Sequence, residues 1–354
     1  MRPLLPVLLV LSLALPAAAR QRAVAAPTPP AVPRIELIAA EALERVPGLS
    51  IAIRKGNEYF SKGWGELDRE THVPVRSGSV FQIASVTKQF TGAAIAKLAE
   101  QGKVNVDDSV RRFIPELDSR FDPITIRHLL EHTSGITDHL GQVDTLYAPK
   151  TQQEVLALIM SRPPYEPAGA RWGYSNAGYY LLGMVIERAS NMSYEQYLRT
   201  TFFEPLQLTD TSYCGTNAPV PEGYGSDPRN GQFFDYPTMN VDLLYAAGAL
   251  CSSATDLVKW NRALTTGAAV SPESYAAMTR GFDSWVGAQY GYGLIADRYR
   301  GHRRIWHNGM IYGFESHVAH FPDDDLTIVV LINWYALRDR ATDIAEDVAA
   351  AMFE

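Results

Sequence analysis

Ser85 and Lys88 are the residues whose types and spacing most directly suggest chemistry. They lie three positions apart where helical apolar spacing begins, so both side chains should share one helix face. A serine hydroxyl is a weak nucleophile until a base takes its proton, and a buried, uncharged lysine can be that base. The pair therefore predicts a lysine-activated serine. The alternative is an exposed helix with a solvated lysine, because about one Ser-x-x-Lys match is expected by chance in a chain of this length.

Two further motifs could complete such a site. Tyr174-Ser175-Asn176 precedes an apolar helical run; a phenol can relay protons, and an amide can bind a carbonyl. The alternative is a helix cap beside a core tyrosine. His307-Asn308-Gly309 lies in a segment that we expect to be an edge strand, where a glycine often marks the close approach of a ligand. The alternative there is a histidine at a strand end next to a bulge.

In this order and in these settings, the three motifs resemble those of the penicillin-recognising serine enzymes. The nucleophile motif Ser85-Val86-Thr87-Lys88 is on a helix, the tyrosine motif on a loop and the histidine motif on a strand. The closest likeness is to class C β-lactamases, D-alanyl-D-alanine carboxypeptidases, D-aminopeptidases and related esterases. Residues 79–84, 129–135 and 177–183 support it, and it extends from about residue 47 to the C-terminal strands.

The resemblance implies a role for each matching residue. Ser85 attacks the carbonyl of an amide, peptide, ester or β-lactam bond and becomes acylated, while Lys88 and Tyr174 transfer the protons. No cofactor and no metal is implied. The implied substrate-binding groups are the Asn176 amide, the strand residues His307 and Gly309, and an oxyanion hole formed by the backbone amides of Ser85 and Met310.

His307 departs from the pattern of the β-lactamases, which usually carry a lysine at this position. That lysine helps to bind a substrate carboxylate, whereas a histidine with an ordinary pKa is largely neutral at pH 7. A histidine here is more similar to the D-aminopeptidases and the broader β-lactamase-related hydrolases. We therefore expect a small-molecule or peptide substrate with an amide or ester bond, rather than a β-lactam.

Two alternatives differ in mechanism. Some relatives of these enzymes serve as penicillin-binding sensors that are acylated and never turn over, and this sequence does not distinguish a sensor from an enzyme. Separately, His128-Leu129-Leu130-Glu131-His132 fits the H-x-x-E-H pattern of zinc metallopeptidases. On a helix, His128 and His132 would share a face, and Glu131 could activate a water molecule. We rank this alternative low because Thr133-Ser134-Gly135 should end the helix at once.

The helices and strands that must position these residues can be predicted from the spacing of apolar residues along the chain. Helical spacing is expected at 35–46, from Ser85 to Gly102 and at 341–353, and a β-hairpin at 48–65. Three strands are expected at 304–310, 314–321 and 326–334. The expected fold class is α/β (α+β), and the expected fold is β-lactamase/transpeptidase-like. Residues 35–105 and 256–354 should form a lobe with a largely antiparallel sheet, which the first and last helices flank. Residues 106–255 should form a mainly helical lobe without clear strand pairs.

The N-terminus is typical of a secretory signal peptide. Arg2 precedes an apolar run that is too short for a comfortable membrane span, and Ala17-Ala18-Ala19 suits signal peptidase. We expect a signal peptide at 1–19, with cleavage near Ala19 or Ala25, and an extended linker rich in proline and alanine at 20–34. The alternative is an uncleaved membrane anchor. The expected location is secreted or periplasmic, with no stable membrane span after cleavage.

Composition and cysteine count set further bounds. The net charge of -7 argues against nucleic acid as a partner, because a phosphate binder needs a positive field. Cys214 and Cys251 could form a disulfide in an oxidising compartment or remain two buried thiols, and the sequence favours neither. The sequence also gives no indication of an oligomeric state.

Overall fold

The computed structural model describes residues 31–354 apart from 144, 217–219, 286 and 337–339. The predicted signal peptide and most of the predicted linker lie outside the described residues. Helix α1 (Val32–Ala42) begins inside that linker, so the extended conformation predicted through Arg34 is wrong at its end. Pro33 lies in the first turn, where a missing backbone N–H costs a helix nothing. In the described part of the chain, no helix is both long and apolar enough to cross a membrane.

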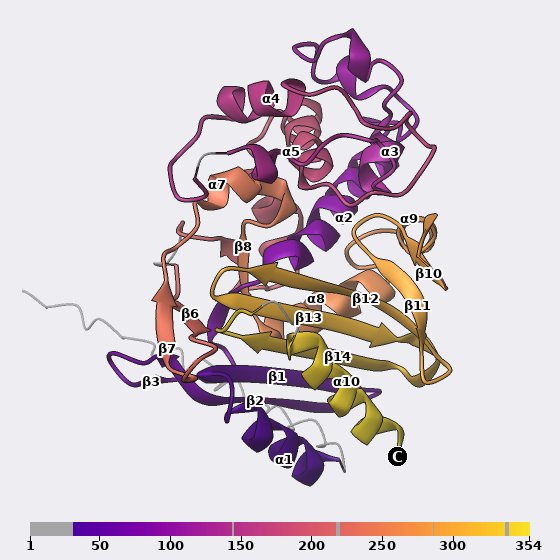
Figure 1. The fold of residues 1–354 in the computed structure, drawn as a ribbon. Helices are drawn as coiled ribbons and strands as arrows, with labels where there is room; N and C mark the ends of the chain where they lie inside the picture. The colour runs from indigo at the N-terminus through magenta and orange to yellow at the C-terminus, as the bar shows by residue number, and fades with distance from the viewer. Residues whose placement is uncertain (1–30, 144, 217–219, 286, 337–339) are drawn as a thin grey trace, which may run out of the picture.

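The described residues form one large antiparallel sheet of nine strands. These strands are β1 (Gly48–Lys55), β2 (Glu58–Asp68), β3 (Val73–Pro74), β9 (Phe282–Trp285), β10 (Ala288–Tyr290), β11 (Ile295–Tyr299), β12 (His302–Ile311), β13 (Phe314–Phe321) and β14 (Leu326–Ile332). Their order is β3-β2-β1-β14-β13-β12-β11-β10-β9 (Figure 1). The N-terminal hairpin therefore joins the C-terminal strands through β1 and β14, which confirms the predicted sheet.

Helices cover both faces of this sheet. Every residue of β14 is buried, and its side chains alternate between two apolar cores, as expected of a strand covered on both sides. On one face, α1 and α10 (Arg340–Phe353) pack over Ile328, Val330 and Ile332, as predicted for the first and last helices (Figure 1). On the other face, α8 (Ala254–Thr265) and the helical lobe pack over Val329 and Leu331.

Most of the remaining helices belong to this second core. They are α2 (Thr87–Glu100), α3 (Ile126–Leu130), α4 (Gln152–Met160), α5 (Asn176–Ser190), α6 (Tyr194–Leu198), α7 (Val241–Leu244) and α9 (Pro272–Met278). Short helical turns connect them: η1 (Ala84–Val86), η2 (Val110–Arg112), η3 (Ser119–Phe121), η4 (His139–Gln142), η5 (Arg199–Phe203), η6 (Tyr245–Ala247) and, before β14, η7 (Pro322–Asp324).

Two predictions about strands are wrong. The segment 106–255 does contain strand pairs, β5 (Ser212–Tyr213) with β8 (Leu250–Ser253) and β6 (Gly223–Ser226) with β7 (Phe233–Tyr236), and β8 also pairs with β4 (Val80–Gln82). These strands have two to four residues, too few to show an alternating pattern. Strand β12 is not an edge strand, because β11, β10 and β9 extend the sheet beyond it.

Cys214 and Cys251 form a disulfide, which resolves the alternative that the sequence left open. Cys214 follows β5, Cys251 lies in β8, and their Cα atoms are 5.0 Å apart. The covalent bond therefore reinforces a two-stranded pairing that has few hydrogen bonds of its own.

Candidate active site

Ser85 lies in the turn η1, which leads directly into α2, and the amine of Lys88 is 3.1 Å from its hydroxyl oxygen. The residue before it, Ala84, has a φ of 44°, a left-handed conformation that costs an L-residue about 1–2 kcal/mol. Strain of this kind persists where the surrounding structure enforces it. Ser85 is thus presented by a constrained turn rather than by a regular helix.

Helix α2 is buried over nearly its whole length, and this determines the environment of Lys88. Phe90 stacks on Trp260 with ring centroids 4.0 Å apart, and Lys88 itself is 0% exposed. Burial lowers the pKa of Lys88 to about 7, while the nearby Asp138 carboxylate acts in the opposite direction. A substantial fraction of Lys88 is therefore uncharged at neutral pH, which excludes the solvated lysine of the alternative interpretation.

In the described part of the chain, three oxygens lie within hydrogen-bond distance of the Lys88 amine. Besides Ser85 Oγ, they are Asn176 Oδ1 at 2.8 Å and the Ala247 carbonyl oxygen at 2.7 Å. These last two oxygens can accept hydrogen bonds but cannot donate them. A neutral amine has two N–H bonds and one lone pair. If the two N–H bonds serve Asn176 and Ala247, the lone pair faces the hydroxyl of Ser85.

The Ala247 carbonyl is held in place by α2 itself. Thr91 donates a hydrogen bond of 2.7 Å to the neighbouring Ala246 carbonyl, and the backbone N–H of Leu250 donates to Thr87 Oγ1 at 3.1 Å. Thr87 and Thr91 are four residues apart and so share the side of the helix that faces η6. The helix that carries the amine thus also anchors one of its acceptors.

Tyr174 donates a hydrogen bond of 2.9 Å to Ser85 Oγ. Its residue surface is 38% exposed, whereas its hydroxyl points inward at Ser85, and burial raises the pKa of the phenol well above its usual value. The ring also lies 4.8 Å from the Lys88 amine. At neutral pH this tyrosine is therefore a proton donor directed at the serine oxygen.

His132 supports the loop that carries Tyr174. Its ring centroid is 4.3 Å from that of Tyr174, and its Nδ1 accepts a hydrogen bond of 3.2 Å from the backbone N–H of Ser175. Burial holds the pKa of His132 well below its usual value, so the ring is neutral. The sequence suggested a metal ligand here, but the contacts show a support beneath the tyrosine.

The geometry required by the zinc alternative does not form. Helix α3 ends at Leu130, and His132 has a φ of 56°, so His128 and His132 do not lie on one helical face. Nδ1 of His128 accepts from the backbone N–H of Thr125 in a capping box, and Glu131 lies 3.9 Å from Arg127. Among the described residues, no group of three or more histidine, cysteine, aspartate or glutamate side chains could hold a metal ion.

Strand β12 lies directly against the turn that carries Ser85. A Cβ placed on Gly309 would collide with the Ile83 carbonyl oxygen and lie 2.5 Å from Ser316 Oγ and 3.0 Å from the backbone nitrogen of Ser85. Glycine is therefore required for this close approach. Met310 follows it and lines the same cavity as Ser85, where the oxyanion hole is predicted.

His307 is close to the site but turned into the protein. It is 2% exposed, its Nδ1 contacts the Asn308 carbonyl oxygen at 2.5 Å, and its Nε2 contacts the Tyr290 hydroxyl at 2.9 Å. Burial lowers the pKa of His307 to about 3. With both ring nitrogens engaged and no charge, His307 is placed to support β12 rather than to bind a substrate carboxylate.

A cavity of about 170 Å³ opens beside Ser85 and Asn176. Among the described residues that line it, none carries a formal charge. The remaining lining residues are mostly apolar or aromatic: Ala84, Leu140, Leu146, Met239, Leu244, Ala247, Gly248, Met310, Ile311, Tyr312 and Tyr335. The cavity therefore suits an uncharged, apolar group bound to the reacting carbonyl.

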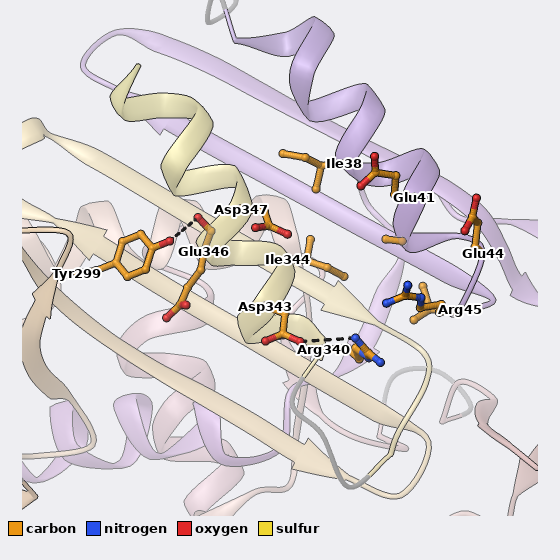
Figure 2. Close-up of a pocket in the computed structure, with 12 residues that line it drawn as sticks. Ile38, Glu41, Glu44, Arg45, Tyr299, Arg340, Asp343, Ile344, Glu346 and Asp347 are labelled. Atoms are coloured by element: carbon orange, nitrogen blue, oxygen red, sulfur yellow. Dashed lines mark hydrogen bonds and ion pairs between the residues drawn. The ribbon is translucent and has the colours of Figure 1, made fainter. Parts of the chain in front are cut away.

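A larger cavity of about 590 Å³ lies on the other face of the sheet, between α1 and α10 (Figure 2). Its walls are largely charged, and Arg340 pairs with Asp343 at 3.6 Å. It contains none of the residues predicted to react, so the smaller cavity beside Ser85 is the candidate active site.

The structure thus brings Ser85, Lys88, Tyr174 and Asn176 into one hydrogen-bonded group, and their catalytic roles remain predictions. Sequence reasoning missed two residues that bond to this group, Asp138 and Ala247, and a third, Tyr290, that bonds to the nearby His307. Asp138 lies three residues after the 129–135 stretch, which could have drawn attention to its loop. Ala247 acts through its backbone carbonyl, which no residue type encodes.

Comparison with known proteins identifies the family of this chain. The sequence profile of the Beta-lactamase family matches residues 35–352. Protein flp of Staphylococcus aureus (strain COL) is 29% identical over 310 residues, which cover 81% of this chain and 60% of the relative. Penicillin-binding protein 4* of Bacillus subtilis (strain 168) is 27% identical, with 81% and 68% covered. The chain therefore spans about three-fifths of the length of the flp proteins.

Solved structures give the same fold. The octameric penicillin-binding protein homologue from Pyrococcus abyssi is 29% identical, with a TM-score of 0.79 over 91% of this chain and 77% of that chain. The D-amino acid amidase from Ochrobactrum anthropi SV3, complexed with L-phenylalanine amide, is 25% identical, with a TM-score of 0.82 over 91% and 98%. These similarities confirm the predicted fold class.

Proposed function

Because this chain belongs to the Beta-lactamase family, we propose that it is a serine hydrolase that forms an acyl-enzyme on Ser85. The observation that carries the proposal is the fully buried Lys88 amine, 3.1 Å from Ser85 Oγ and bonded to two acceptor oxygens. In the first step, neutral Lys88 accepts the hydroxyl proton while Ser85 Oγ bonds to the substrate carbonyl carbon. The negative charge that develops on the carbonyl oxygen would be stabilised by the backbone N–H groups of Ser85 and Met310.

In the second step the bond to the leaving group breaks, and the Tyr174 hydroxyl supplies the proton that the leaving nitrogen or oxygen needs. Tyr174 regains a proton from the Lys88 ammonium, which restores the neutral amine. A water molecule then attacks the ester on Ser85 and gives a proton to the neutral Lys88 amine. The ester bond breaks, and Ser85 Oγ takes this proton from Lys88 and becomes a hydroxyl again. The raised pKa of Tyr174 suits this role, because the phenol holds its proton until a stronger base forms beside it.

We further propose an amide or ester with an uncharged acyl group as substrate. No described residue lining the cavity is charged, and the neutral ring of His307 offers no cation for a carboxylate. A D-amino acid amidase among the structural neighbours is consistent with amide cleavage. A β-lactam or a peptide with a terminal carboxylate would lack a cationic partner here. Deacylation of nitrocefin at the rate of a β-lactamase would contradict this choice.

The test of the proposed function is intact-mass spectrometry after incubation with a fluorophosphonate and, separately, with a penicillin. The wild-type protein should gain one fluorophosphonate adduct, and Ser85→Ala should gain none. Ser161→Ala, which removes an exposed serine at the end of α4, is the control and should be labelled like the wild type. An adduct that persists on Ser85→Ala would refute the assignment. Stoichiometric penicillin acylation without turnover would instead identify a sensor.

We also propose that the protein is secreted or periplasmic. The disulfide between Cys214 and Cys251 supports this, because such bonds persist in oxidising compartments. Expression of the full chain in a Gram-negative bacterium should yield periplasmic protein that begins after Ala19 or Ala25. An uncleaved N-terminus on protein retained in the cytoplasm would contradict the proposal.

A further inference from the structure

Asp138 links two elements of the active site through its carboxylate. It is the N-cap of η4, where Oδ1 accepts a hydrogen bond of 3.0 Å from the backbone N–H of Leu140. Its other oxygen, Oδ2, accepts from the backbone N–H of Asn176 at 3.0 Å and from the Asn176 side-chain nitrogen at 2.8 Å. Asn176 is the first residue of α5, whose N-cap Ser175 makes no side-chain capping bond.

The contact with the Asn176 side chain decides what that side chain presents to Lys88. An amide can turn either its oxygen or its NH₂ group toward a neighbour. If the NH₂ group faced Lys88, it would donate to the lone pair of the neutral amine and block it as a base. An ionised carboxylate only accepts hydrogen bonds, so Asp138 holds the NH₂ group on its own side in both protonation states of Lys88.

We propose that Asp138 is a positioning residue: it orients the Asn176 amide so that the lone pair of Lys88 faces Ser85. The inference rests on the proposed function of the Ser85 site and names a residue that acts through Asn176 rather than on the substrate. It also explains why a carboxylate is placed beside a lysine that must lose its proton.

The charge of Asp138 has a second effect on Lys88, separate from its contact with Asn176. Lys88 is faced by the rings of Tyr174 and Tyr179, at 4.8 and 5.4 Å, and its charged form also interacts with His132, His139 and His307. Burial lowers the pKa of each of these histidines, so at neutral pH they add no charge. Asp138 also has His139 Nδ1 at 3.6 Å from its Oδ1.

Among the described residues, the Asp138 carboxylate is therefore the anion that stabilises protonated Lys88, against the effect of burial. Its removal should lower the pKa of Lys88 further. The acid limb of the acylation rate should then move to lower pH.

A purely structural role makes a different prediction. Asp138 also caps η4 and the start of α5, and the loss of a cap costs about 1 kcal/mol of stability. Loss of stability alone would leave the pH profile of the folded protein unchanged. Because loss of the charge alone would also move the acid limb, the coupling between Asp138 and Asn176 is what distinguishes positioning from capping.

The experiment measures the rate of Ser85 labelling by a fluorophosphonate as a function of pH. The two carboxylate oxygens of Asp138 accept from Leu140 and from Asn176, whereas Asp138→Asn keeps only one acceptor oxygen. We therefore expect the limiting rate of labelling to be about 10²-fold lower and its acid limb to lie at lower pH. Asp138→Glu keeps the charge on a longer side chain and should slow labelling while the acid limb stays in place. The control is Asp118→Asn, which removes another carboxylate that caps a short helix, η3, and pairs with Arg120; its profile should match the wild type.

A double-mutant cycle then tests the route through Asn176. Asp138→Ala should slow labelling in the wild type but change it less than about threefold in an Asn176→Ala background. Additive losses, or an acid limb in Asp138→Asn that matches the wild type, would overturn the proposal. Circular dichroism checks that each variant is folded. If Asp138→Asn and Asp138→Ala do not fold, the labelling rate of Asp138→Glu decides the test. Absence of labelling in the wild type would instead refute the proposed function.

Discussion

The charge state of one side chain, Lys88, should set the pH dependence of acylation. An unperturbed lysine is protonated at neutral pH, but burial lowers the pKa of Lys88 to about 7. Below pH 7 the amine carries a proton and cannot accept another, and above pH 7 it is free. The rate of Ser85 acylation should therefore fall about tenfold for each pH unit below 7 and level off above it.

Replacement of this lysine by arginine tests that explanation. A guanidinium stays protonated at all usable pH values, so Lys88→Arg should lose at least about 10²-fold in acylation rate at every pH. Lys97→Arg is the matched control, because Lys97 lies on the same helix, is partly exposed and pairs with Glu100. The measurement is fluorophosphonate labelling from pH 5 to 9. A Lys88→Arg variant with a normal rate would show that another group is the base.

At this scale the sequence identified the side chains that the structure brings together and missed their supports. These side chains, Ser85, Lys88, Tyr174 and Asn176, belong to short motifs that occur in the same order in a known family, so the sequence alone was enough to find them. The Ala247 carbonyl could not be predicted, since a backbone acceptor has no sequence signature. Asp138 lies in an irregular loop whose approach to α5 depends on tertiary packing.

Among the elements, β12 controls the shape of the site through its contact with the η1 turn. Gly309→Ala would place a Cβ against the Ile83 carbonyl and 3.0 Å from the nitrogen of Ser85. We expect a loss of about 1–3 kcal/mol in the free energy of unfolding, because overpacking forces backbone shifts. Labelling of Ser85 should also slow, since the shift displaces the turn that carries it.

Gly141→Ala is the control for this substitution, because a Cβ at Gly141 meets no atom within 4 Å. Its free energy of unfolding, measured by urea denaturation, should stay within about 0.5 kcal/mol of the wild type. Equal stabilities of Gly309→Ala and Gly141→Ala would show that β12 and η1 have room to separate.

The prediction of elements succeeded where runs were long and failed where they were short. The strands β12, β13 and β14 have seven to ten residues and clear apolar patterns, and the sequence located them. The strand β11, which pairs with β12, has only five residues, and β10 and β9 beyond it have three and four; the sequence did not reveal them, so it predicts β12 at an edge that it does not occupy. Short strands are specified by their partners more than by their own residues.

At the scale of the whole molecule, the disulfide joins Cys251 of strand β8 to Cys214, the residue that follows β5. Strand β8 pairs with β4, which leads into the turn of Ser85, and Leu250 of β8 bonds to Thr87 at the start of α2. The disulfide thus holds a strand that contacts two elements of the candidate active site, β4 and the start of α2. The sequence could not predict this pairing, because the separation of the two Cα atoms depends on the complete fold.

Loss of this disulfide should destabilise the protein without changing the chemistry of the folded state. The bond closes a loop with a sequence separation of 37 residues, so Cys214→Ser/Cys251→Ser should lower the free energy of unfolding by about 4 kcal/mol. Urea denaturation of the wild type with and without dithiothreitol should show the same difference. In conditions where both proteins are folded, Ser85 labelling rates should agree within about threefold, because the Ala247 and Thr87 contacts do not involve either sulfur. Equal denaturation midpoints with and without reductant would contradict a stabilising role for the bond. A large loss of labelling in the folded double variant would show instead that β8 positions the acceptor of Lys88 only while it is covalently held.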